Sequence, residues 1–385
     1  MLTRRIQGVK PSSTLRITAL ARDLKAQGKK VINLAAGEPD WDTPEPIKAA
    51  AIQAIQEGFT KYTPTTGIPE LKAAIVQTAA RERGITYRPE QVAVTCGAKQ
   101  AIFNLLQVLV QSEEEVLIPS PYWVSYPEMV RLAGGTPVEV KSSPADGFRL
   151  DPRAMEKAIS SRAKLLILNS PSNPTGAILD RDRLKEIARV ARAQRLWIIS
   201  DEIYRNLTFD SECLSIVSAA PEILEQTVIV DGVSKSYAMT GWRIGYLAGP
   251  ADLVEATARL QDHSTSNPTS ISQRAALAAL TSDRSFVKSL TEELKRRRDL
   301  LVNRLSQIPR LSFVKPEGAF YCFVDISATG LRSDPFSERL LQEAQVALIP
   351  GAGFGWDTHV RISFTTEMVN LEEGLHRLDR FVRSL

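Results

Sequence analysis

Short apolar runs rich in β-branched residues alternate along the chain with longer segments whose apolar residues recur at helical spacing. The clearest helical segments cover residues 99–110 and 181–193. Strands that alternate with helices are typical of a mostly parallel sheet covered by helices on both faces, because parallel strands need crossover connections. The pattern therefore predicts an α/β fold. The runs expected to form strands are VAVTC (92–96), EVLIP (115–119), LLILN (165–169), WIIS (197–200) and TVIV (227–230).

A further apolar run, residues 244–248, follows TVIV after a connection that is too short for an ordinary crossover helix. We therefore expect this strand to run antiparallel to its neighbour. After about Ser270 the pattern changes to long helical stretches, followed by the strand-like sequences GAFYCFVDI and VALIPG. This change indicates a second, smaller α+β lobe, and the length of 385 residues also exceeds the usual size of one compact domain.

The composition is that of a globular protein, with 43% hydrophobic residues, 24% charged residues and a net charge of +4. The one basic cluster, KRRR at 295–298, lies among leucines at helical spacing, which favours the solvated face of a long helix over a nucleic-acid site. The cysteines Cys96, Cys213 and Cys322 are far apart, so we expect neither a metal site nor a disulfide framework. Without a leader-like or membrane-spanning apolar run, we expect a cytoplasmic protein with no membrane or nucleic-acid partner.

Polar residues follow four of the predicted strands at the point where each strand ends. In an open α/β sheet, ligands bind beyond the carboxyl ends of the strands, so these groups are expected to face one site. They offer an anion cradle, an amide, a carboxylate and an amine. The four groups are Gly97-Ala98-Lys99, SPSNPTG (170–176), Asp201 with Glu202 and Tyr204, and the loop that carries Lys235.

Each of these signals is weak by itself. SPSNPTG is a common turn sequence, Asp201 could cap a helix, and Lys235 could reach solvent. Their place at the same end of successive strands favours a binding site instead. The combination suits a phosphorylated aldehyde with a pyridine ring. Lysine forms a Schiff base with an aldehyde, Asp201 can pair with a pyridinium nitrogen, and Arg243 can bind the phosphate.

Several longer motifs extend this interpretation over nearly the whole chain: VKPSSTLRI, AAGEPDWDTP, TKYTPTTGIPELK, PYWVSYPEMV, SPSNPTGA, SDEIY, DGVSKSYAMTGWRIGYLAGP and HVRISF. Together they resemble the class I, fold-type I pyridoxal-phosphate aminotransferases, and most of all the bacterial aspartate aminotransferase subgroup with its prephenate-using relatives. The resemblance implies a mostly parallel seven-stranded sheet sandwiched by helices in a large domain of residues 46–290. It also implies a smaller α+β domain formed by residues 1–45 and 291–385.

The resemblance implies a role toward pyridoxal 5′-phosphate for each matching residue. Lys235 would attach the cofactor and move the proton at the substrate Cα, while Asp201 would pair with the ring nitrogen. Tyr204 and Asn173 would hydrogen-bond the ring oxygen, and Trp123 would stack on the ring, although Trp123 alone could be plain core. The phosphate would be held by Gly97, Ala98, Ser234, Arg243 and, from the neighbouring subunit of a homodimer with shared sites, Tyr62.

The resemblance also implies how the substrate is bound. Arg361, with Asn173 and the Gly37 backbone, would bind the α-carboxylate, because a planar guanidinium binds a carboxylate bidentately; Trp123 would lie beside it. The segment 261–270 lacks the arginine that animal-type aspartate enzymes use for the second carboxylate. In the resembling bacterial subgroup that part falls to the residue at Lys99, which Ser13 and Thr14 could assist.

A second departure from the family is Gly232, which stands where a phosphate-binding serine is often found. The resemblance implies an aspartate aminotransferase that moves an amino group between L-aspartate or L-glutamate and 2-oxo acids such as 2-oxoglutarate and oxaloacetate. The alternative is a prephenate aminotransferase, dependent on glutamate or aspartate, or another class I specificity. A different fold-type I enzyme and a non-enzymatic ligand sensor are the rival classes, and Arg361 and Lys235 respectively weigh against them.

Overall fold

A computed structural model describes residues 2, 4–9 and 13–385. Its larger sheet has seven strands in the order β2-β8-β7-β6-β5-β3-β4. Every neighbouring pair is parallel except those that involve β8, which runs antiparallel to both β2 and β7. The α/β fold and the antiparallel strand predicted from the sequence are therefore confirmed. The strands are β2 (Val92–Thr95), β3 (Glu115–Ser120), β4 (Thr136–Lys141), β5 (Ala163–Asn169), β6 (Trp197–Asp201), β7 (Thr227–Gly232) and β8 (Gly245–Ala248).

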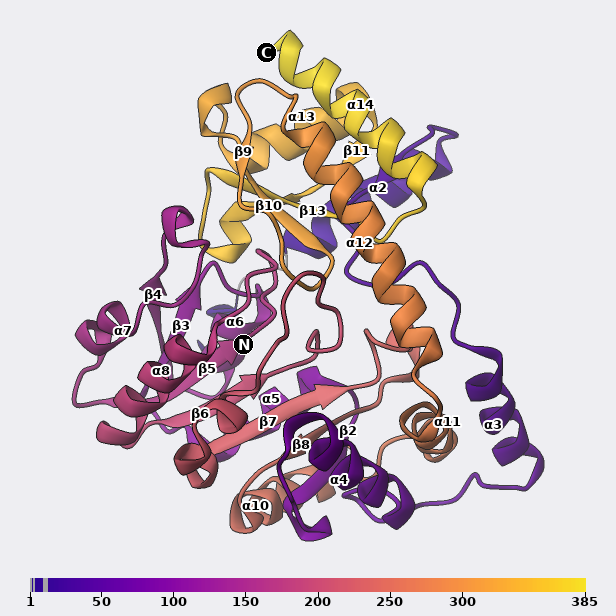
Figure 1. The fold of residues 1–385 in the computed structure, drawn as a ribbon, viewed down its shortest axis with the longest axis vertical. Helices are drawn as coiled ribbons and strands as arrows, with labels where there is room; N and C mark the ends of the chain where they lie inside the picture. The colour runs from indigo at the N-terminus through magenta and orange to yellow at the C-terminus, as the bar shows by residue number, and fades with distance from the viewer. Residues whose placement is uncertain (1, 3, 10–12) are drawn as a thin grey trace.

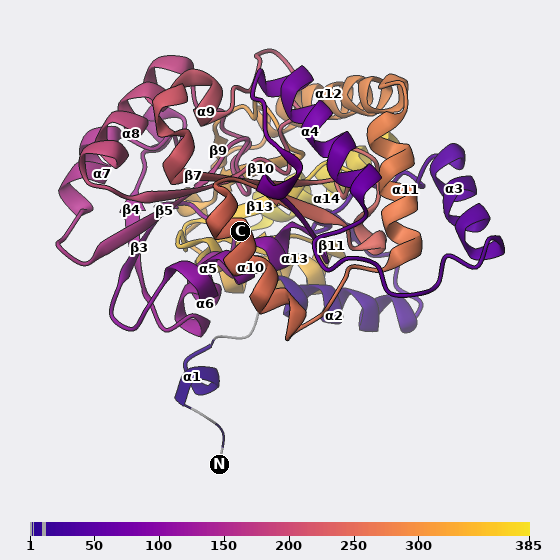
Figure 2. The ribbon, with the colours of Figure 1, turned by 90° about the horizontal axis from the view of Figure 1, so that it is seen from below.

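Helices cover both faces of this sheet (Figures 1 and 2). Because successive side chains of a strand point to opposite faces, Leu166 and Leu168 join one apolar cluster while Leu165 and Ile167 join the other. This is why the central strands are apolar throughout. The first cluster is covered by α3 (Glu45–Gln56), α4 (Pro69–Arg83), α7 (Pro152–Ala158), α8 (Arg181–Ala193), α9 (Ile216–Ala219) and α11 (Ser270–Thr281), and the second by α5 (Ala98–Leu109), α6 (Ser125–Leu132) and α10 (Ala251–Asp262).

The smaller lobe is built on a four-stranded sheet in the order β12-β13-β10-β9, in which every neighbouring pair is antiparallel. The N-terminal part of the chain joins this lobe, because β1 (Ile32–Asn33) pairs with β11 (Val346–Ala347). The other elements are α1 (Arg4–Gln7), α2 (Ser13–Ala26), β9 (Ser312–Phe313), β10 (Tyr321–Asp325), α12 (Ser285–Leu305), α13 (Ser333–Ala344), β12 (Ile349–Pro350), β13 (His359–Ser363) and α14 (Met368–Ser384). The predicted strands GAFYCFVDI and VALIPG correspond to β10 and to β11 with β12.

The basic cluster in α12 is not a solvated face as expected. Arg297 and Arg298 are buried, and only Lys295 and Arg296 keep exposed side chains. Arg297 lies 4.1 Å above the Trp41 ring and pairs with Asp40, while Arg298 pairs with Asp210. The leucine spacing marks one buried face of the helix, and we assigned the basic residues to the opposite, solvated face. That assignment failed for Arg297 and Arg298 because a guanidinium can be buried when aromatic rings and carboxylates surround it.

No helix in the described part of the chain is both long and apolar enough to cross a bilayer. Within the same residues, no group of three or more histidine, cysteine or acidic side chains is arranged to hold a metal ion.

Candidate active site

A cavity of about 470 Å³ lies at the carboxyl ends of the large-sheet strands, where they meet β10 and β13 of the small lobe. The cavity is bordered mainly by residues that the sequence pointed to. These are Gly37, Ala98, Lys99, Trp123, Asn173, Asp201, Tyr204, Ser234, Lys235, Arg243 and Arg361.

Lys235 occupies the loop after β7 and is half-buried. Its Nζ donates a hydrogen bond to the carbonyl oxygen of Gly37 at 2.6 Å. Burial lowers the pKa of this amine to about 8, although the nearby Glu38 carboxylate acts in the opposite direction. About a tenth of the amine is therefore neutral at pH 7, far more than for an ordinary lysine, and an amine that attacks a carbonyl needs to be neutral.

Asp201 is the last residue of β6 and is buried. Its Oδ2 accepts a hydrogen bond of 2.6 Å from the Tyr126 hydroxyl, and its Oδ1 accepts one of 3.3 Å from the Ile203 N–H. Burial raises the pKa of Asp201 to about 6, and these two donors limit the rise. A cationic ring nitrogen next to Asp201 would stabilise the ionised carboxylate. The sequence interpretation missed Tyr126, which PYWVSYPEMV contains but which no spacing rule links to Asp201.

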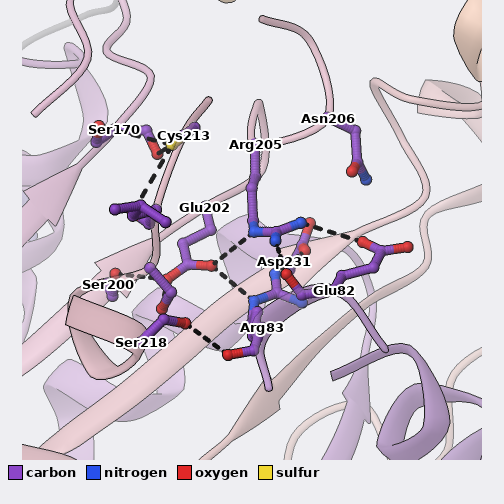
Figure 3. Close-up of polar contacts among 12 residues, drawn as sticks. Glu82, Arg83, Ser170, Ser200, Glu202, Arg205, Asn206, Cys213, Ser218 and Asp231 are labelled. Atoms are coloured by element: carbon purple, nitrogen blue, oxygen red, sulfur yellow. Dashed lines mark hydrogen bonds and ion pairs between the residues drawn. The ribbon is translucent and has the colours of Figure 1, made fainter. Parts of the chain in front are cut away.

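A buried ionic network is centred on Arg83, Glu202 and Asp231 (Figure 3). Arg83, at the end of α4, donates from Nε to Glu202 at 2.7 Å and also pairs with Asp231. The hydroxyl groups of Ser200 and Ser215 donate to Glu202, and Tyr246 donates to Asp231. Glu202 directly follows β6, and Asp231 is the penultimate residue of β7. Both carboxylates raise the pKa of Asp201, and the positive charge of Arg83 offsets part of this effect. No sequence signal marked Arg83.

Gly97 and Arg243 form a compact anion cradle at the N-terminus of α5. Gly97 has φ +88°, and a Cβ on it would lie 2.6 Å from Arg243 Nη2, so a side chain here would push the guanidinium away. Arg243 donates from Nη1 to the Thr240 carbonyl at 2.9 Å and from Nη2 to the Cys96 carbonyl at 3.3 Å. The helix N-terminus and the guanidinium together suit a phosphate.

Gly232 leaves little room for the serine often found in the family. A Cβ at this position would lie 3.0 Å from both the Gly245 Cα and the Ile244 carbonyl oxygen. Strands β7 and β8 approach each other so closely there that a side chain would require the backbone of β8 to shift by a few tenths of an ångström. Ser234, which is buried and lines the cavity, is the hydroxyl that remains on this loop.

Arg361 on β13 is a buried guanidinium. It donates from Nη1 to Asn173 Oδ1 at 3.1 Å and from Nη2 to the Ala35 carbonyl at 2.9 Å. Its Nε has no hydrogen-bond partner among the described residues. Burial without an acidic partner lowers the pKa of Arg361. Such a side chain is prepared for an anion that comes from outside the protein.

Aromatic side chains border the remaining walls. Lys99 Nζ lies 4.8 Å from the centre of the Trp123 ring, and burial lowers the pKa of this lysine. The Tyr204 hydroxyl lies 3.0 Å from the hydroxyl of Tyr321, a residue of β10 that the sequence interpretation did not select. The strand-like pattern of GAFYCFVDI predicted the element but gave no reason to separate one aromatic residue from the others.

Outside the N-terminal segment, two predicted residues are not part of the cavity wall: Gly97, which lies beside Arg243, and Tyr62. Tyr62 is 91% exposed on the surface of this single chain, as a residue that reaches into a second subunit would be. Ser13 and Thr14 begin α2, but their side chains lie outside what the structure describes.

Comparison with known proteins identifies the class. The family described as "Aminotransferase class I and II" matches residues 29–378, and the chain belongs to this family. The protein is an aminotransferase, and membership implies dependence on pyridoxal phosphate.

Individual relatives are similar over their full length. The aspartate aminotransferase of Geobacillus stearothermophilus is 47% identical, over 100% of this chain and 99% of that protein. The aspartate/prephenate aminotransferase of Thermus thermophilus is 46% identical, over 98% of each chain. The solved structure "aspartate aminotransferase from Thermus thermophilus with maleate" has a TM-score of 0.95 at 45% identity, over 99% of each chain. This likeness agrees with the seven-stranded sheet and the smaller lobe.

Proposed function

We propose that the protein is an aspartate aminotransferase that exchanges amino groups between L-aspartate or L-glutamate and 2-oxo acids. One observation carries the proposal. Lys99, Lys235, Arg243 and Arg361 line one cavity, none of them forms an ion pair with a residue that the structure describes, and Asp201 is the only acid among the described lining residues. A phosphate and two carboxylates would balance this charge. The names of the relatives, aspartate and aspartate/prephenate aminotransferases, agree with such ligands.

The residues in the cavity wall, with Gly97 beside it, fit pyridoxal phosphate. Gly97, Ala98, Ser234 and Arg243 would hold its phosphate, and Trp123 would cover its ring. Bound there, the cofactor supplies an aldehyde that condenses with amines and a ring that withdraws electrons from the substrate Cα. Asp201, kept in place by Tyr126, would hold a proton on the ring nitrogen, while Tyr204 and Asn173 would donate to the ring oxygen.

The protein's own groups would then bind and deprotonate the substrate. Arg361, Asn173 and the Gly37 backbone would orient the α-carboxylate. Once released from the aldehyde, the neutral Lys235 amine would take the proton from the substrate Cα and return it on the cofactor side. Its pKa of about 8 is close to the working pH, so the amine can both accept and donate a proton. Lys99 would bind the second carboxylate with assistance from Ser13 and Thr14. This flexible cation would also tolerate a larger acid such as prephenate.

We also infer a homodimer with shared sites, which the exposed Tyr62 supports. The chain would divide into a large domain, 46–290, and a small domain, 1–45 with 291–385. Separate apolar clusters in the two lobes support this division, whose boundary falls within α12.

The test is a panel of half-reactions followed by the absorbance of the bound cofactor. Aspartate and glutamate are expected to convert the cofactor to its amine form faster than alanine does. Oxaloacetate, 2-oxoglutarate or prephenate should then restore the aldehyde form, and prephenate as the best acceptor would favour the alternative specificity. Lys235→Ala is the control, and borohydride reduction with peptide mapping should place the label on Lys235. An enzyme that aspartate and glutamate leave unchanged would contradict the proposal.

A further inference from the structure

Tyr321 connects two residues of the proposed site. It is the first residue of β10, it is 1% exposed, and it lines the cavity from the small lobe. Its hydroxyl lies 3.0 Å from the Tyr204 hydroxyl, while its ring lies 4.3 Å from Arg361 Cζ. One side chain thus contacts both the phenol expected to serve the cofactor and the guanidinium expected to bind the substrate.

The two hydroxyl groups form a closed pair. Among the described residues, neither hydroxyl has a hydrogen-bond partner other than the opposite one. Burial raises the pKa of both phenols, so both keep their protons at neutral pH. A pair of hydroxyl groups needs only one proton for the bond between them. If Tyr321 is the donor, the proton of Tyr204 is free to point into the cavity.

The ring of Tyr321 has a different neighbour. The Arg361 guanidinium lies over its face, and the Phe354 ring centre is 5.3 Å from the same Cζ. Attraction between a cation and an aromatic face is strongest where water is excluded, as it is around this buried arginine. The ring therefore fixes the plane in which the free N–H groups of Arg361 lie.

We propose that Tyr321 is a positioning residue with two separable roles. Its hydroxyl directs the Tyr204 proton toward the cofactor ring oxygen, and its ring holds Arg361 in the orientation that binds the α-carboxylate. The inference rests on the proposed function, because it takes Tyr204 as a donor to the cofactor and Arg361 as the carboxylate-binding group.

The hydroxyl role is tested by absorbance titration of the cofactor-loaded enzyme, without turnover. Loss of the Tyr204 donor in Tyr204→Phe should raise the pKa of the bound cofactor by about 1–2 units, because one charge-assisted hydrogen bond is lost. Tyr321→Phe should raise it by roughly 0.2–0.6 unit, since it weakens that donor only through a cooperative hydrogen bond. In the Tyr204→Phe background, Tyr321→Phe should add nothing. Tyr87→Phe is the control, because Tyr87 is buried and its hydroxyl is unpartnered among the described residues.

The outcomes distinguish a failure of the role proposed for the Tyr321 hydroxyl from a failure of the role proposed for Tyr204. A shift with Tyr204→Phe but none with Tyr321→Phe would overturn the hydroxyl role of Tyr321 alone. An equal effect of Tyr321→Phe in both backgrounds would also overturn it, because the effect would not pass through Tyr204. No shift with either variant would contradict the assignment of Tyr204 itself, and the hydroxyl role would fall with it.

The ring role is tested by steady-state kinetics with Tyr321→Phe and Tyr321→Leu. Phenylalanine keeps the aromatic face, so KM for aspartate and 2-oxoglutarate should stay within about twofold of the wild type. Leucine removes the face, and both KM values should rise about ten- to thirtyfold, the loss expected for a desolvated cation–π contact. Equal KM values for the two variants would overturn the ring role. If Tyr321→Leu does not fold, Tyr321→Met provides the same comparison.

Discussion

Arg361 of the small lobe donates a hydrogen bond of 3.1 Å from Nη1 to Oδ1 of Asn173 in the large lobe, and both residues line the cavity. Asn173 is itself held by the bond from its N–H to Asn169 Oδ1, and the Asn169 amide donates to the carbonyl of Asp201. The β13 arginine is thereby connected to the end of β6, where the acid of the site lies. A carboxylate bound to Arg361 would consequently be placed relative to Asp201 by a short chain of hydrogen bonds.

The first prediction concerns the shape of the Arg361 side chain. Arg361→Lys keeps a positive charge but loses the planar fork and the contact of the guanidinium with two acceptors. We expect kcat/KM to fall for every amino acid tested by about 1.5–3 kcal/mol, roughly ten- to a hundredfold, because all of them carry the α-carboxylate. Arg339→Lys on the surface of α13 is the control. A loss confined to aspartate and glutamate would assign Arg361 to the second carboxylate instead.

The second prediction concerns the pH dependence of the apoprotein. Burial raises the folded-state pKa of Asp201 from 3.8 to about 6, so the native state binds this proton more tightly than the unfolded chain does. This contribution to stability is complete below the unfolded pKa and is lost as the pH rises through about 6. Asp201→Asn does not titrate. Its stability relative to wild type should therefore rise by up to about 3 kcal/mol between pH 4 and pH 8.

Urea denaturation of both apoproteins across that pH range measures this difference. Glu222→Gln at an exposed position is the control and should show no such trend. A stability difference between Asp201→Asn and wild type that does not change with pH would contradict a raised pKa at Asp201. With cofactor bound, the same variant should lose amino-transfer activity.

The third prediction concerns the ionic network of Figure 3. Arg83→Met leaves the buried carboxylates of Glu202 and Asp231 without their shared cation. Breaking a buried pair from one side typically costs about 3–5 kcal/mol, and we expect a loss of that size in thermal or chemical unfolding. Arg81→Met removes a neighbouring arginine whose side chain is 51% exposed and should cost under about 1 kcal/mol. Equal losses in the two variants would contradict a special role for the buried pair.

The elements of the fold that the sequence predicted share one physical property. Strands buried on both faces, such as β5, are continuous apolar runs bounded by turn residues, so periodicity alone finds them. The edge strand β4 escaped individual prediction because it is mostly half-exposed or exposed, and its TPVEVK sequence lacks such a run. The family resemblance supplied the seventh strand, which the pattern did not.

The residues of the candidate site also fall into a group that the sequence predicted and a group that it missed. Residues carried by motifs at strand ends, such as Lys235 and Asp201, were found because the end of a strand has a known place in the sheet. Tyr126, Tyr321 and Arg83 were missed because each acts through a tertiary contact over 75 or more positions of the chain. No local pattern marks such a pair. The burial of Arg297 and Arg298 was missed for the same reason.

The fourth prediction concerns Tyr62 and the second subunit. Tyr62→Phe should weaken cofactor retention by about 1.5–3 kcal/mol, the value of one hydrogen bond to a charged group. Heterodimers of Tyr62→Phe with Lys235→Ala distinguish the two arrangements. If Tyr62 acts across the interface, the only site with a lysine regains wild-type cofactor affinity, since its tyrosine comes from the unaltered position of the other chain. Cofactor dissociation from purified heterodimers measures this, and retention of the weakened affinity would mean that Tyr62 serves its own subunit.

The last prediction concerns the selection of dicarboxylic substrates. Lys99 lies at the cavity wall above Trp123, has no ion-pair partner among the described residues, and has a pKa lowered by burial and by the nearby Arg243. A second carboxylate would relieve both effects, because it restores a counter-charge to a desolvated ammonium. Lys99→Ala should lower kcat/KM for aspartate and glutamate by about 1.5–3 kcal/mol, roughly ten- to a hundredfold, and leave alanine nearly unchanged.

Two further variants test whether the charge of Lys99 is what matters. Lys99→Arg should keep much of the preference for aspartate over alanine, whereas Lys99→Gln should not. The deciding quantity is the aspartate-to-alanine ratio of kcat/KM in each variant. A ratio equal to the wild-type value in Lys99→Ala would place recognition of the second carboxylate elsewhere, with Ser13 and Thr14 the next residues to change.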